Sequence, residues 1–502
     1  MNGALNTRPL SALLEGYAEA PPELAVTGVA LDSRQVAPGS LFLAVRGHVQ
    51  HGLAHVAQAL QRGAAAVAWE LAEGVAAPVL PVPAIAVDDL ARKAGDIAAR
   101  FWKHPSRALY TVGITGTDGK TSTAHLIAQA LDRLATPCAY FGTLGYGRLG
   151  ALAAAALTTP DPVRLQALLA AQRDSGARAC AMEVSSHALD QQRVAGVEFD
   201  AAVLTNVGRD HLDYHGSVEH YAAAKRRLFA LPGLRSAVLN ADDAHGQRWL
   251  AELAAEAASP ATVAYSVDAP PPTAGRYVRA ERLTLHPAGL QMQLATSWGK
   301  AEFASRLFGR FNAYNLLAAL AVLLVQGTPL DAAVAALAQS ATVPGRVEGF
   351  QRAEGGPLVV VDYAHTPQAL TLVLAALRPH VTGRLICVFG CGGDRDRGKR
   401  PLMGAAAAAG ADLFIVTDDN PRSEDPAAIV REIQAGLPVG VEGRVIHERP
   451  RAIATAVELA KAGDIVVIAG KGHEDYQIYG SERRDFSDRA YVAGLLGLVP
   501  RP

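Results

Sequence analysis

The stretch YTVGITGTDGKTSTAHLIAQALDRL, residues 110–134, decides the fold of this 502-residue chain. Its apolar start, Tyr110–Ile114, predicts a buried strand, and the amphipathic residues Lys120–Leu134 predict a helix. Between them lies the loop TGTDGKT (115–121), in which glycines precede a lysine and a hydroxyl residue. Glycine amides at a helix start can hold phosphate oxygens, the lysine can reach terminal phosphates and the hydroxyl can help to hold Mg²⁺. The stretch therefore predicts an ATP site in an α/β domain.

The loop departs from the common pattern G-x-x-x-x-G-K-[ST], because Ile114 occupies the place of its first glycine. A second stretch, GDRDRGK (393–399), fits the first seven positions, but Arg400 then replaces the hydroxyl residue. Its two aspartates, Asp394 and Asp396, would also direct carboxylates toward phosphate. We therefore predict that 393–399 is an arginine-bearing loop for another anion, a substrate carboxylate.

The composition is that of a folded protein with sizeable cores: 50% of residues are hydrophobic and 19% are charged. With 47 basic and 48 acidic residues, the net charge of −1 argues against general affinity for nucleic acid or membrane surfaces. The cysteines are scattered, and the neighbouring pair Cys387 and Cys391 lacks further ligands at zinc spacing, so both are predicted to be buried thiols.

No segment of the chain has the pattern of a signal peptide or a membrane span. The N-terminus lacks a long apolar core, and the longest strongly apolar stretch, Leu316–Val325, is too short to cross a bilayer. We expect a soluble, cytoplasmic monomer that acts on small molecules and binds neither nucleic acid nor membrane.

Proline and glycine interrupt the pattern at His104-Pro105-Ser106 and Val343-Pro344-Gly345, which predicts domains at 1–107, 108–342 and 343–502. Short apolar runs alternate with helical patterns in the second and third of these, as parallel strands covered on both faces do. The predicted strands are Tyr110–Ile114, Ala179–Met182, Ala201–Leu204, Ala237–Leu239, Leu358–Val361, Leu385–Phe389, Leu413–Val416 and Ile465–Ala469.

Between Glu281 and Leu307 the apolar period changes to two, which predicts a small antiparallel extension of the middle domain. The predicted fold class is therefore α/β in three domains. The first is an α/β domain, the second has a mostly parallel sheet like that of P-loop ATPases, and the third is Rossmann-like.

Polar side chains follow almost every predicted strand. Because ligands of open α/β sheets lie beyond the carboxyl ends of the strands, these side chains predict where substrates meet. They include Lys120-Thr121, Glu183 to His187, Asn206 to His211 and Asn240 to Asp242 in the second domain, and Asp362 to His365, Gly390 to Arg395, Asp418 to Arg422 and Gly470 to Glu474 in the third.

Taken in order, these segments resemble the Mur ligase family over nearly the whole chain, from about Leu31 to Glu474. The matching pieces are LDSR (31–34), TGTDGKT (115–121), TTP (158–160), EVSSHALDQQRV (183–194), TNVGRDHLDYHGS (205–217), YAAAKRRLF (221–229), GRFNAYN (309–315), GRVE (345–348), DYAHTP (362–367), FGCGGDRDRGKRP (389–401), DDNPR (418–422) and GKGHE (470–474). Each is weak evidence alone, but their number and order make coincidence implausible. One residue departs from the family, which usually has asparagine at the place of Asp118.

The resemblance is strongest to those members that add meso-2,6-diaminopimelate to UDP-N-acetylmuramoyl-L-alanyl-D-glutamate in peptidoglycan precursor synthesis. It implies amide formation in two steps, with ATP and Mg²⁺ as cofactors. ATP phosphorylates the D-glutamate γ-carboxylate, and the amine of diaminopimelate then attacks the acyl phosphate. Such phosphoryl transfer depends mainly on charge neutralisation and alignment.

By resemblance, the catalytic residues are Lys120, Glu183, His211 and Lys225, with Thr121, Glu183, His211 and a carbamylated Lys225 as metal ligands. Carbamylation requires a neutral amine, so burial or cationic neighbours must lower the lysine pKa. From the residues alone, Glu183 as a helix cap or ion-pair partner and Lys225 as a surface lysine stay open. The residues implied for ATP are Gly116, Thr117, Asp118, Gly119, Lys120, Thr121, Ser122, Asn312, Arg346 and Asp362.

The resemblance also implies residues for the two other substrates. For the UDP-sugar dipeptide they are Leu31, Ser33, His48, Val49, Gln50, Thr158, Thr159, Ser185, Gln191 and Arg193. For diaminopimelate they are Arg395, Asp419, Asn420, Pro421, Arg422, Gly470 and Glu474, with Arg422 reading the second carboxylate bidentately. A plain Asn-Pro turn with Arg422 in solvent is the alternative for this segment.

Two other functions stay open. One is a sibling ligase for lysine or for folate-type glutamates, against which Arg422 and the LDSR and EVSSHAL segments argue. The other is a nucleotide-binding regulatory module without ligase activity, which the full set Lys120, Glu183, His211, Lys225 and Asp362 disfavours.

Overall fold

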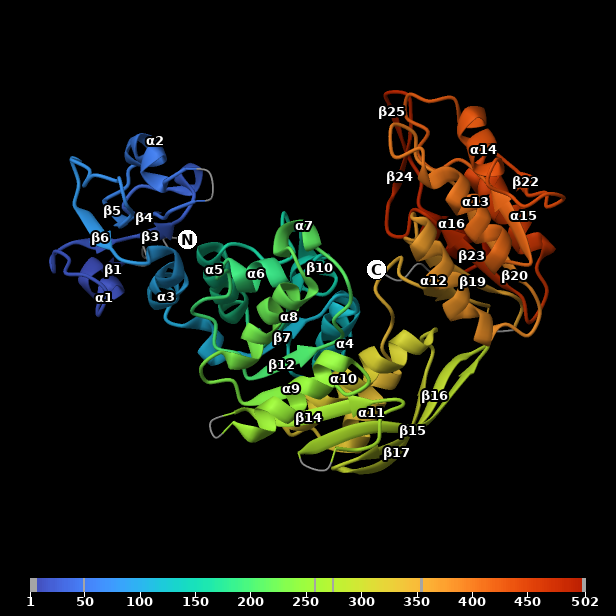
Figure 1. Ribbon diagram of the computed structural model, residues 1–502, viewed down its shortest axis with the longest axis horizontal. Helices are drawn as coiled ribbons and strands as arrows, with labels where there is room; N and C mark the ends of the chain where they lie inside the picture. The colour runs from blue at the N-terminus through green and yellow to red at the C-terminus, as the bar shows by residue number, and fades with distance from the viewer. Residues whose placement is uncertain (1–6, 48–49, 257–258, 273–274, 353–354, 499–502) are drawn as a thin grey trace. The chain divides into compact units, whose positions relative to one another are not determined.

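The computed structural model describes residues 7–47, 50–256, 259–272, 275–352 and 355–498 (Figure 1). The chain packs into two compact units. The first holds most of the chain up to Tyr265, and the second holds most of the chain from Val278 onward.

The first unit begins with a parallel sheet in the order β3-β4-β5-β6. Continuous apolar runs such as LFLA (41–44) and AVAW (66–69) form its buried central strands. The elements are β1 (Arg8–Pro9), α1 (Leu10–Leu14), β2 (Ala25–Val26), β3 (Gly28–Ala30), β4 (Ser40–Ala44), α2 (Val56–Gln61), β5 (Ala66–Glu70), β6 (Ala84–Val87) and α3 (Leu90–Phe101), with short 3₁₀ turns at Ser33–Gln35, Gly52–His55 and Pro105–Ala108.

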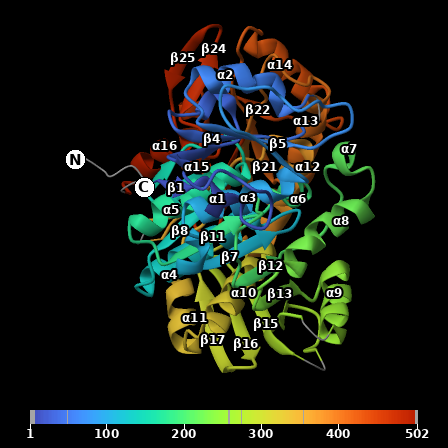
Figure 2. The same cartoon turned by 90° about the vertical axis from the view of Figure 1, so that its left-hand side faces the viewer.

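The larger sheet of the first unit has the order β10-β9-β8-β11-β7-β12-β13-β14, and the strands from β8 through β11 to β14 are parallel. Figure 2 shows β8, β11, β7, β12 and β13 side by side in this order. The elements are β7 (Tyr110–Thr115), α4 (Lys120–Arg133), β8 (Cys138–Gly142), β9 (Gly145–Arg148), β10 (Ala151–Ala153), α5 (Pro162–Asp174), β11 (Ala179–Glu183), α6 (Ser186–Asp190), β12 (Ala201–Leu204), α7 (Leu212–His215), α8 (Val218–Arg226), β13 (Ser236–Asn240), α9 (Ala244–Ala255) and β14 (Ala261–Ser266).

The order of these strands determines which strand ends lie beside the glycine loop. The chain leaves β7, in the middle of the sheet, for the glycine loop, and β11 and β12 lie on either side of it. Polar residues that follow β11 and β12 therefore lie next to the glycine loop at one sheet edge, as ligand sites of α/β sheets do.

Helix α3 packs against α5, and glycine makes a close approach possible at one point of this region. A Cβ on Gly95 of α3 would lie 2.1 Å from the Ala195 carbonyl oxygen, and a Cβ on Gly196 would lie 2.5 Å from the Gly95 carbonyl oxygen. Both glycines are therefore needed for backbone to meet backbone here.

The second unit contains an antiparallel ladder, β15 (Arg276–His286), β16 (Gly289–Thr296) and β17 (Gly299–Ser305). The period-two pattern of residues 281–307 is thus confirmed. His380 ties this ladder to the parallel part of the unit, because its ring nitrogens pair with the carbonyl of His286 at 2.8 Å and the amide of Gly309 at 2.9 Å.

The parallel sheet of the second unit has the order β18-β19-β23-β20-β21-β22, with β18 antiparallel at one edge. Alternate residues enter opposite cores: Val360 lies in one hydrophobic cluster, and Val359 and Val361 lie in the other. The elements are α10 (Arg310–Gln326), α11 (Leu330–Ala338), β18 (Glu348–Phe350), β19 (Leu358–Asp362), α12 (Pro367–Leu377), β20 (Leu385–Phe389), α13 (Lys399–Gly410), β21 (Leu413–Val416), α14 (Pro426–Gln434), β22 (Arg444–Val445), α15 (Arg449–Leu459), β23 (Ile465–Ala469), β24 (Tyr476–Tyr479), β25 (Glu482–Asp485) and α16 (Asp488–Leu495).

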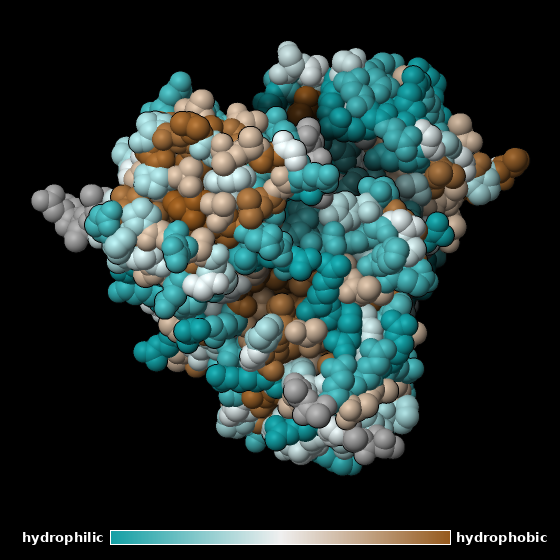
Figure 3. All heavy atoms as spheres, turned by 60° about the vertical axis from the view of Figure 1, so that its left-hand side comes forward, coloured by the Kyte–Doolittle hydropathy of each residue, from teal (hydrophilic) through white to brown (hydrophobic). Residues whose placement is uncertain are grey.

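The predicted fold class and all eight predicted strands are confirmed. The free cysteines are buried, as expected for Cys387 and Cys391. In the described part of the chain, no helix is long and apolar enough to cross a membrane. Figure 3 shows one face, on which hydrophilic residues cover much of the surface and hydrophobic ones gather in patches.

We predict that Gly95→Ala lowers the free energy of unfolding by about 1–3 kcal/mol, because its Cβ has no room against the Ala195 carbonyl. Thermal unfolding of the variant measures this. Gly494→Ala is the matched control, since Gly494 also lies in a helix but has no atom within 4 Å of its added Cβ. The control should be neutral or stabilising by up to about 1 kcal/mol. Equal melting temperatures for the two variants would contradict the close approach.

Candidate functional site

The glycine loop after β7 has a conformation that needs glycine. Gly116 has φ 150° and Gly119 has φ 82°, and α4 begins directly after them at Lys120. A Cβ on Gly116 would lie 1.8 Å from the Thr205 hydroxyl oxygen, which follows the neighbouring strand β12. That hydroxyl donates to the Asp118 carbonyl at 2.6 Å. The loop is thus held open at the start of a helix, the arrangement that binds phosphate.

Asp118 is fixed by its backbone, while its side chain is exposed. The Asn206 side chain accepts from the Asp118 amide at 3.0 Å and donates to its carbonyl at 3.2 Å. An exposed carboxylate is screened by water, so the residue that departs from the family pattern leaves the shape of the loop intact.

Two lysine amines converge on one oxygen of this loop. Lys120 Nζ donates to the Gly116 carbonyl at 2.9 Å, and Lys225 Nζ, from α8, donates to the same carbonyl at 2.8 Å. Lys225 is only 1% exposed, and its nitrogen lies 4.2 Å from the centre of the Tyr221 ring. The alternative of a surface lysine at 225 is therefore wrong.

Burial, followed by the charge of Lys120, lowers the pKa of Lys225 to about 6. The pKa of Lys120 is lowered as well, mainly by burial. Arg226 and Arg227 do not face Lys225, because they pair with Glu252 and Glu256 and with Asp190 respectively. At neutral pH the Lys225 amine is mostly uncharged, and a neutral amine is the form that reacts as a nucleophile.

Glu183 ends β11 and is 1% exposed. One carboxylate oxygen accepts from the Tyr140 hydroxyl at 2.5 Å and the Thr143 amide at 2.9 Å, and the other accepts from the Thr121 hydroxyl at 2.9 Å. Its carboxylate is thus held against the first turn of α4. The cap of the following helix is Ser185, which accepts from the Ala188 amide at 3.1 Å, so the alternative of Glu183 as that helix cap is wrong.

The donors at this loop suit Mg²⁺. In the described residues no group of three or more histidine, cysteine or acidic side chains is arranged around a metal position. Mg²⁺ commonly uses one or two protein oxygens together with phosphate oxygens and water. The adjacent Thr121 hydroxyl and Glu183 carboxylate supply such oxygens.

His211 lies in an aromatic cluster beside the loop. It has φ 50°, and its ring centre is 4.8 Å from that of His187 and 6.2 Å from that of Tyr221. The Tyr221 hydroxyl lies 3.2 Å from the Thr117 hydroxyl. Burial lowers the pKa of His187, which favours its neutral ring at pH 7. Through Tyr221, the cluster connects His211 to Thr117 of the glycine loop, and the His211 side chain is about half exposed.

The residues predicted for the UDP-sugar dipeptide fall into two groups. Thr159, buried after the β10 region, donates to the Glu183 carbonyl at 2.8 Å, and Arg193 donates to the Thr159 carbonyl at 3.1 Å and to Gln191. Thr158 faces Thr143 at 3.3 Å between hydroxyl oxygens. This first group, together with Ser185, is thus built onto the same strand end as Glu183.

The other group lies in the N-terminal sheet region. Ser33 is buried and donates to Gln58 at 2.7 Å, and Leu31 packs on the hydrophobic core. The Gln50 amide nitrogen lies 2.7 Å from a His55 ring nitrogen. His48 and Val49 lie outside the described residues.

Three residues predicted for the nucleotide belong to the second unit. Asn312 is buried and donates to the Phe308 carbonyl at 2.8 Å, while accepting from Asn315 at 3.1 Å. Asp362 accepts from the Val347 and Ala364 amides, each at 2.8 Å, and the Arg346 guanidinium lies 5.1 Å from the centre of the Tyr363 ring. Beside them, α12 is capped by Thr366, whose hydroxyl accepts from the Ala369 amide at 3.3 Å.

The predicted amino-acid residues come together at the carboxyl ends of β21 and β23. Asn420 is 4% exposed; it donates to Glu474 at 3.3 Å and accepts from the Ile478 amide at 3.0 Å. Glu474 also pairs with the fully buried Lys471 at 3.1 Å. A Cβ on Gly470 would lie 2.7 Å from an Asp419 carboxylate oxygen, so Gly470 allows this packing.

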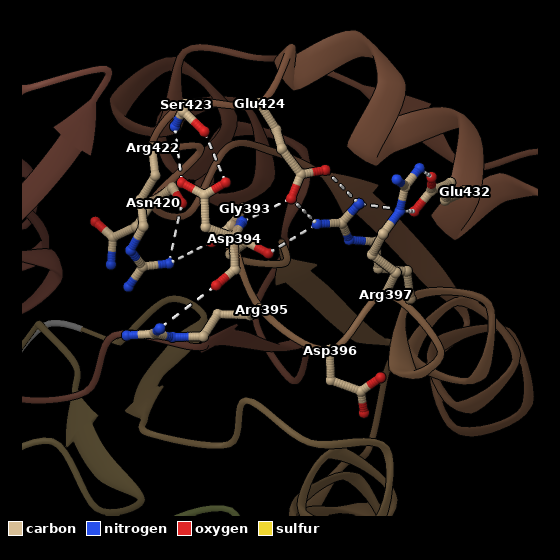
Figure 4. Close-up of polar contacts among 12 residues, drawn as sticks. Gly393, Asp394, Arg395, Asp396, Arg397, Asn420, Arg422, Ser423, Glu424 and Glu432 are labelled. Carbon is tan, nitrogen blue, oxygen red and sulfur yellow. Dashed lines mark hydrogen bonds and ion pairs between the residues drawn. The ribbon is translucent and has the colours of Figure 1, made fainter.

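Arg422 is not a solvent arginine on a plain turn. Its Nη1 donates to the Gly393 carbonyl at 2.7 Å, and its backbone has φ 51° (Figure 4). Arg395 points from the neighbouring loop and donates to the Asp394 carbonyl at 3.4 Å. The second glycine motif forms no phosphate cradle, because the Gly398 amide is taken by Asp396 at 2.9 Å.

Several contacts of the site were missed from sequence. Tyr140 and Thr143 hold Glu183, Tyr221 holds Thr117, and Lys471 holds Glu474. Lys471 and Glu474 lie three residues apart in the segment GKGHE (470–474), but their contact was not predicted. Tyr140, Thr143 and Tyr221 are far along the chain from their partners. For Tyr140 and Thr143 the signal was indirect, since they lie in and after an apolar run, CAYFG (138–142), that forms strand β8 beside β11.

Fold and site together define an α/β protein with a glycine phosphate loop at the centre of a parallel sheet. Three domain descriptions match the chain in order: Mur ligase family, catalytic domain, at residues 25–102; Mur ligase middle domain at 114–323; and Mur ligase, glutamate ligase domain, at 345–472. The chain belongs to the Mur ligase family.

Two curated relatives and one solved structure that resemble the chain over nearly its whole length share a name. The chain is 52% identical over 484 residues to the UDP-N-acetylmuramoyl-L-alanyl-D-glutamate--2,6-diaminopimelate ligase of Ectopseudomonas mendocina (strain ymp), covering 96% of each chain. It is 50% identical over 474 residues to the protein of the same name from Pseudomonas aeruginosa, covering 94% of this chain and 95% of the other. A solved structure of a ligase of this name matches with a TM-score of 0.80 and 38% identity, covering 98% of this chain and 99% of that one.

We predict that Gly116→Ala abolishes measurable ATP binding, because the added Cβ would collide with the Thr205 hydroxyl and displace the loop. Isothermal titration with ATP and Mg²⁺ measures this. Gly208→Ala is the control, since its Cβ would meet Thr117 at an ordinary 3.6 Å. The control should bind ATP within about twofold of the parent chain. Binding retained by Gly116→Ala would place the nucleotide elsewhere.

Proposed function

We propose that this chain is an ATP-dependent ligase that joins meso-2,6-diaminopimelate to the D-glutamate γ-carboxylate of UDP-N-acetylmuramoyl-L-alanyl-D-glutamate. The observation that carries this proposal is the convergence of Lys120, Lys225 and the Thr121–Glu183 pair at one strand end. Together with the shared name of its relatives, that convergence supports carboxylate activation by phosphoryl transfer, which needs cations around the transferred group.

In the first step Lys120 binds the terminal phosphates. Its present partners are backbone carbonyls of its own loop, at 2.9 Å for Gly116 and 2.8 Å for Thr117. The amides at the N-terminus of α4 bind the remaining phosphate oxygens. The γ-carboxylate of the dipeptide attacks the γ-phosphorus and ADP leaves, which gives an acyl phosphate.

Thr121, Glu183 and His211, with Lys225 as a carbamate, would hold the Mg²⁺ ions. When bound, Mg²⁺ supplies positive charge that neutralises the phosphate oxygens of the reacting groups. Lys225 becomes a carbamate when its neutral amine attacks CO₂ and loses a proton, so that a neutral amine is exchanged for an anionic, carboxylate-like group. The low pKa of this buried amine supports the modification.

The dipeptide substrate is held by the residues around Thr159. Arg193 offers guanidinium donors beside the strand end that carries Glu183, and Thr158, Ser185 and Gln191 add hydroxyl and amide groups. Leu31, Ser33 and the segment His48–Gln50 contact the uridine end. We assign these contacts to a UDP-binding domain at 1–107, followed by an ATP-binding domain at 108–342 and an amino-acid-binding domain at 343–502.

In the second step the amine of diaminopimelate attacks the acyl phosphate and phosphate leaves. Arg422 pairs with the carboxylate at the distant end of the amino acid. Its Nη1 is used by the protein, whereas no described residue occupies its Nε and Nη2, which form one edge of the guanidinium fork. Arg395, Asp419, Asn420, Pro421, Gly470 and Glu474 surround the amino-acid end, while Asn312, Arg346 and Asp362 contact the adenosine.

We predict that phosphate release from ATP requires both the UDP-sugar dipeptide and diaminopimelate. With lysine in place of diaminopimelate, kcat/KM should fall roughly 100-fold or more, because the Arg422 fork is left without a carboxylate. A coupled phosphate assay with diaminopimelate, lysine or no amine measures this. Equal rates with lysine would contradict the substrate assignment, and release independent of the dipeptide would contradict the ligase.

A further inference from the structure

Two loops at the amino-acid end of the second unit are joined by a polar network that the function above does not use. One loop is 392–397 and the other is 420–424, and Figure 4 shows Asp394 of the first loop beside Ser423 and Glu424 of the second. The network consists of Arg400, Glu424, Glu432, Asp394 and Ser423; below it is called the Arg400 network.

Arg400 is the buried member of this network. It lies in the first turn of α13 and is 0% exposed, an uncommon position for an arginine. Its Nη1 and Nη2 donate to the two Glu424 oxygens at 2.9 and 2.8 Å, and Nη1 also donates to Glu432 at 2.7 Å. Nη2 reaches the Gly392 carbonyl at 3.1 Å, so that one guanidinium contacts both loops.

Glu424 and Asp394 connect Arg400 to Ser423. The Asp394 amide donates to Glu424 at 2.6 Å, and the Asp394 carboxylate accepts from the Ser423 hydroxyl at 2.7 Å and the Ser423 amide at 3.1 Å. The Gly393 amide donates to the Asn420 carbonyl at 2.9 Å. Charged groups in such hydrogen bonds hold geometry more strongly than neutral ones do.

Arg422 lies within these bonds. Its neighbour Ser423 is fixed by Asp394, and its own Nη1 donates to the Gly393 carbonyl, next to Asp394. Both Arg422 and Asp394 have positive φ, 51° and 52°, a conformation that costs energy for residues other than glycine. The hydrogen bonds of Asp394 to Ser423 and of Arg422 to Gly393 hold both residues in this conformation.

We propose that Arg400, acting through Glu424 and Asp394, is a positioning residue that fixes the direction of Arg422 and thereby sets the selectivity for an amino acid with a second carboxylate. The inference rests on the proposed function, since it concerns the same substrate. Arg400 itself is too deeply buried to touch that substrate. Arg400, which follows GDRDRGK (393–399) where a phosphate loop would have serine or threonine, is thus assigned a role of its own.

A purely structural role for Arg400 would make a different prediction. Loss of general packing would lower activity with every amino acid in proportion. Loss of the direction of Arg422 would instead weaken diaminopimelate far more than lysine, because only diaminopimelate has the carboxylate that Arg422 reads. The ratio of kcat/KM for diaminopimelate to that for lysine separates the two roles.

The test compares Arg400→Met, Ser423→Ala and Arg397→Ala in the full chain, with steady-state kinetics for both amino acids and for ATP. Arg400→Met keeps the volume but leaves Glu424 and Glu432 without their buried partner. Ser423→Ala removes one hydroxyl of the network. Arg397→Ala is the matched control, because Arg397 pairs with the same Glu432 from an exposed position and does not contact Glu424.

We expect Arg400→Met to raise the KM for diaminopimelate about tenfold or more and to lower the selectivity ratio equally, with the KM for ATP within about twofold. Ser423→Ala should lower the ratio about threefold, and Arg397→Ala should leave it within about twofold. An unchanged ratio in a folded Arg400→Met variant overturns the inference. If that variant does not fold, an unchanged ratio in Ser423→Ala overturns it. Lack of any preference for diaminopimelate in the parent chain instead contradicts the proposed function.

Discussion

The Gly116 carbonyl oxygen, which accepts hydrogen bonds from both Lys120 and Lys225, is the contact on which the site depends. Two ammonium groups at one buried oxygen repel each other, and burial disfavours both charges. Burial and the charge of Lys120 therefore lower the pKa of Lys225 to about 6, so that only one of the two amines need carry a charge. Lys225 is then mostly a neutral amine, the form that can be modified. In the proposed function, Lys120 binds phosphate and Lys225 is the residue that is modified.

The scaffold makes that contact possible by keeping side chains out of the loop. β7 lies between β11 and β12, and the Thr205 hydroxyl that follows β12 occupies the space where a residue larger than glycine would put its Cβ. Glu183 is fixed by Tyr140 and Thr143 before any ligand arrives. The amino-acid end of the second unit follows the same principle, because buried Lys471 and Arg400 hold the loops that carry Glu474 and Arg422. In the proposed function, the binding groups are therefore oriented by neighbouring side chains.

Sequence alone predicted the parts of this arrangement that lie close together in the chain. The strand–loop–helix at 110–134 and the longer apolar runs have local patterns, so the fold class and eight of the strands could be predicted from them. Contacts between distant segments have no such pattern, which is why Tyr140 beside Glu183 and Thr205 beside Gly116 were missed. Arg400 was noticed only because it replaces the serine or threonine of the phosphate-loop pattern. Its burial could not be predicted, because it depends on Glu424 and Glu432 from another part of the chain. The burial of Lys225 likewise depends on the packing of α8 against the rest of the domain, which the sequence pattern does not predict.

The state of Lys225 tests the account most directly. ¹³C NMR of the protein equilibrated with ¹³C-bicarbonate reports a lysine carbamate as a carbonyl resonance bound to the protein. The account predicts one such resonance at pH 8 that is absent from Lys225→Ala, is retained in Lys399→Ala, and is lost when the pH falls below about 6 and the amine is protonated. A resonance that persists in Lys225→Ala, or none in the parent chain at pH 8, would contradict the claim that burial beside Lys120 makes this amine reactive.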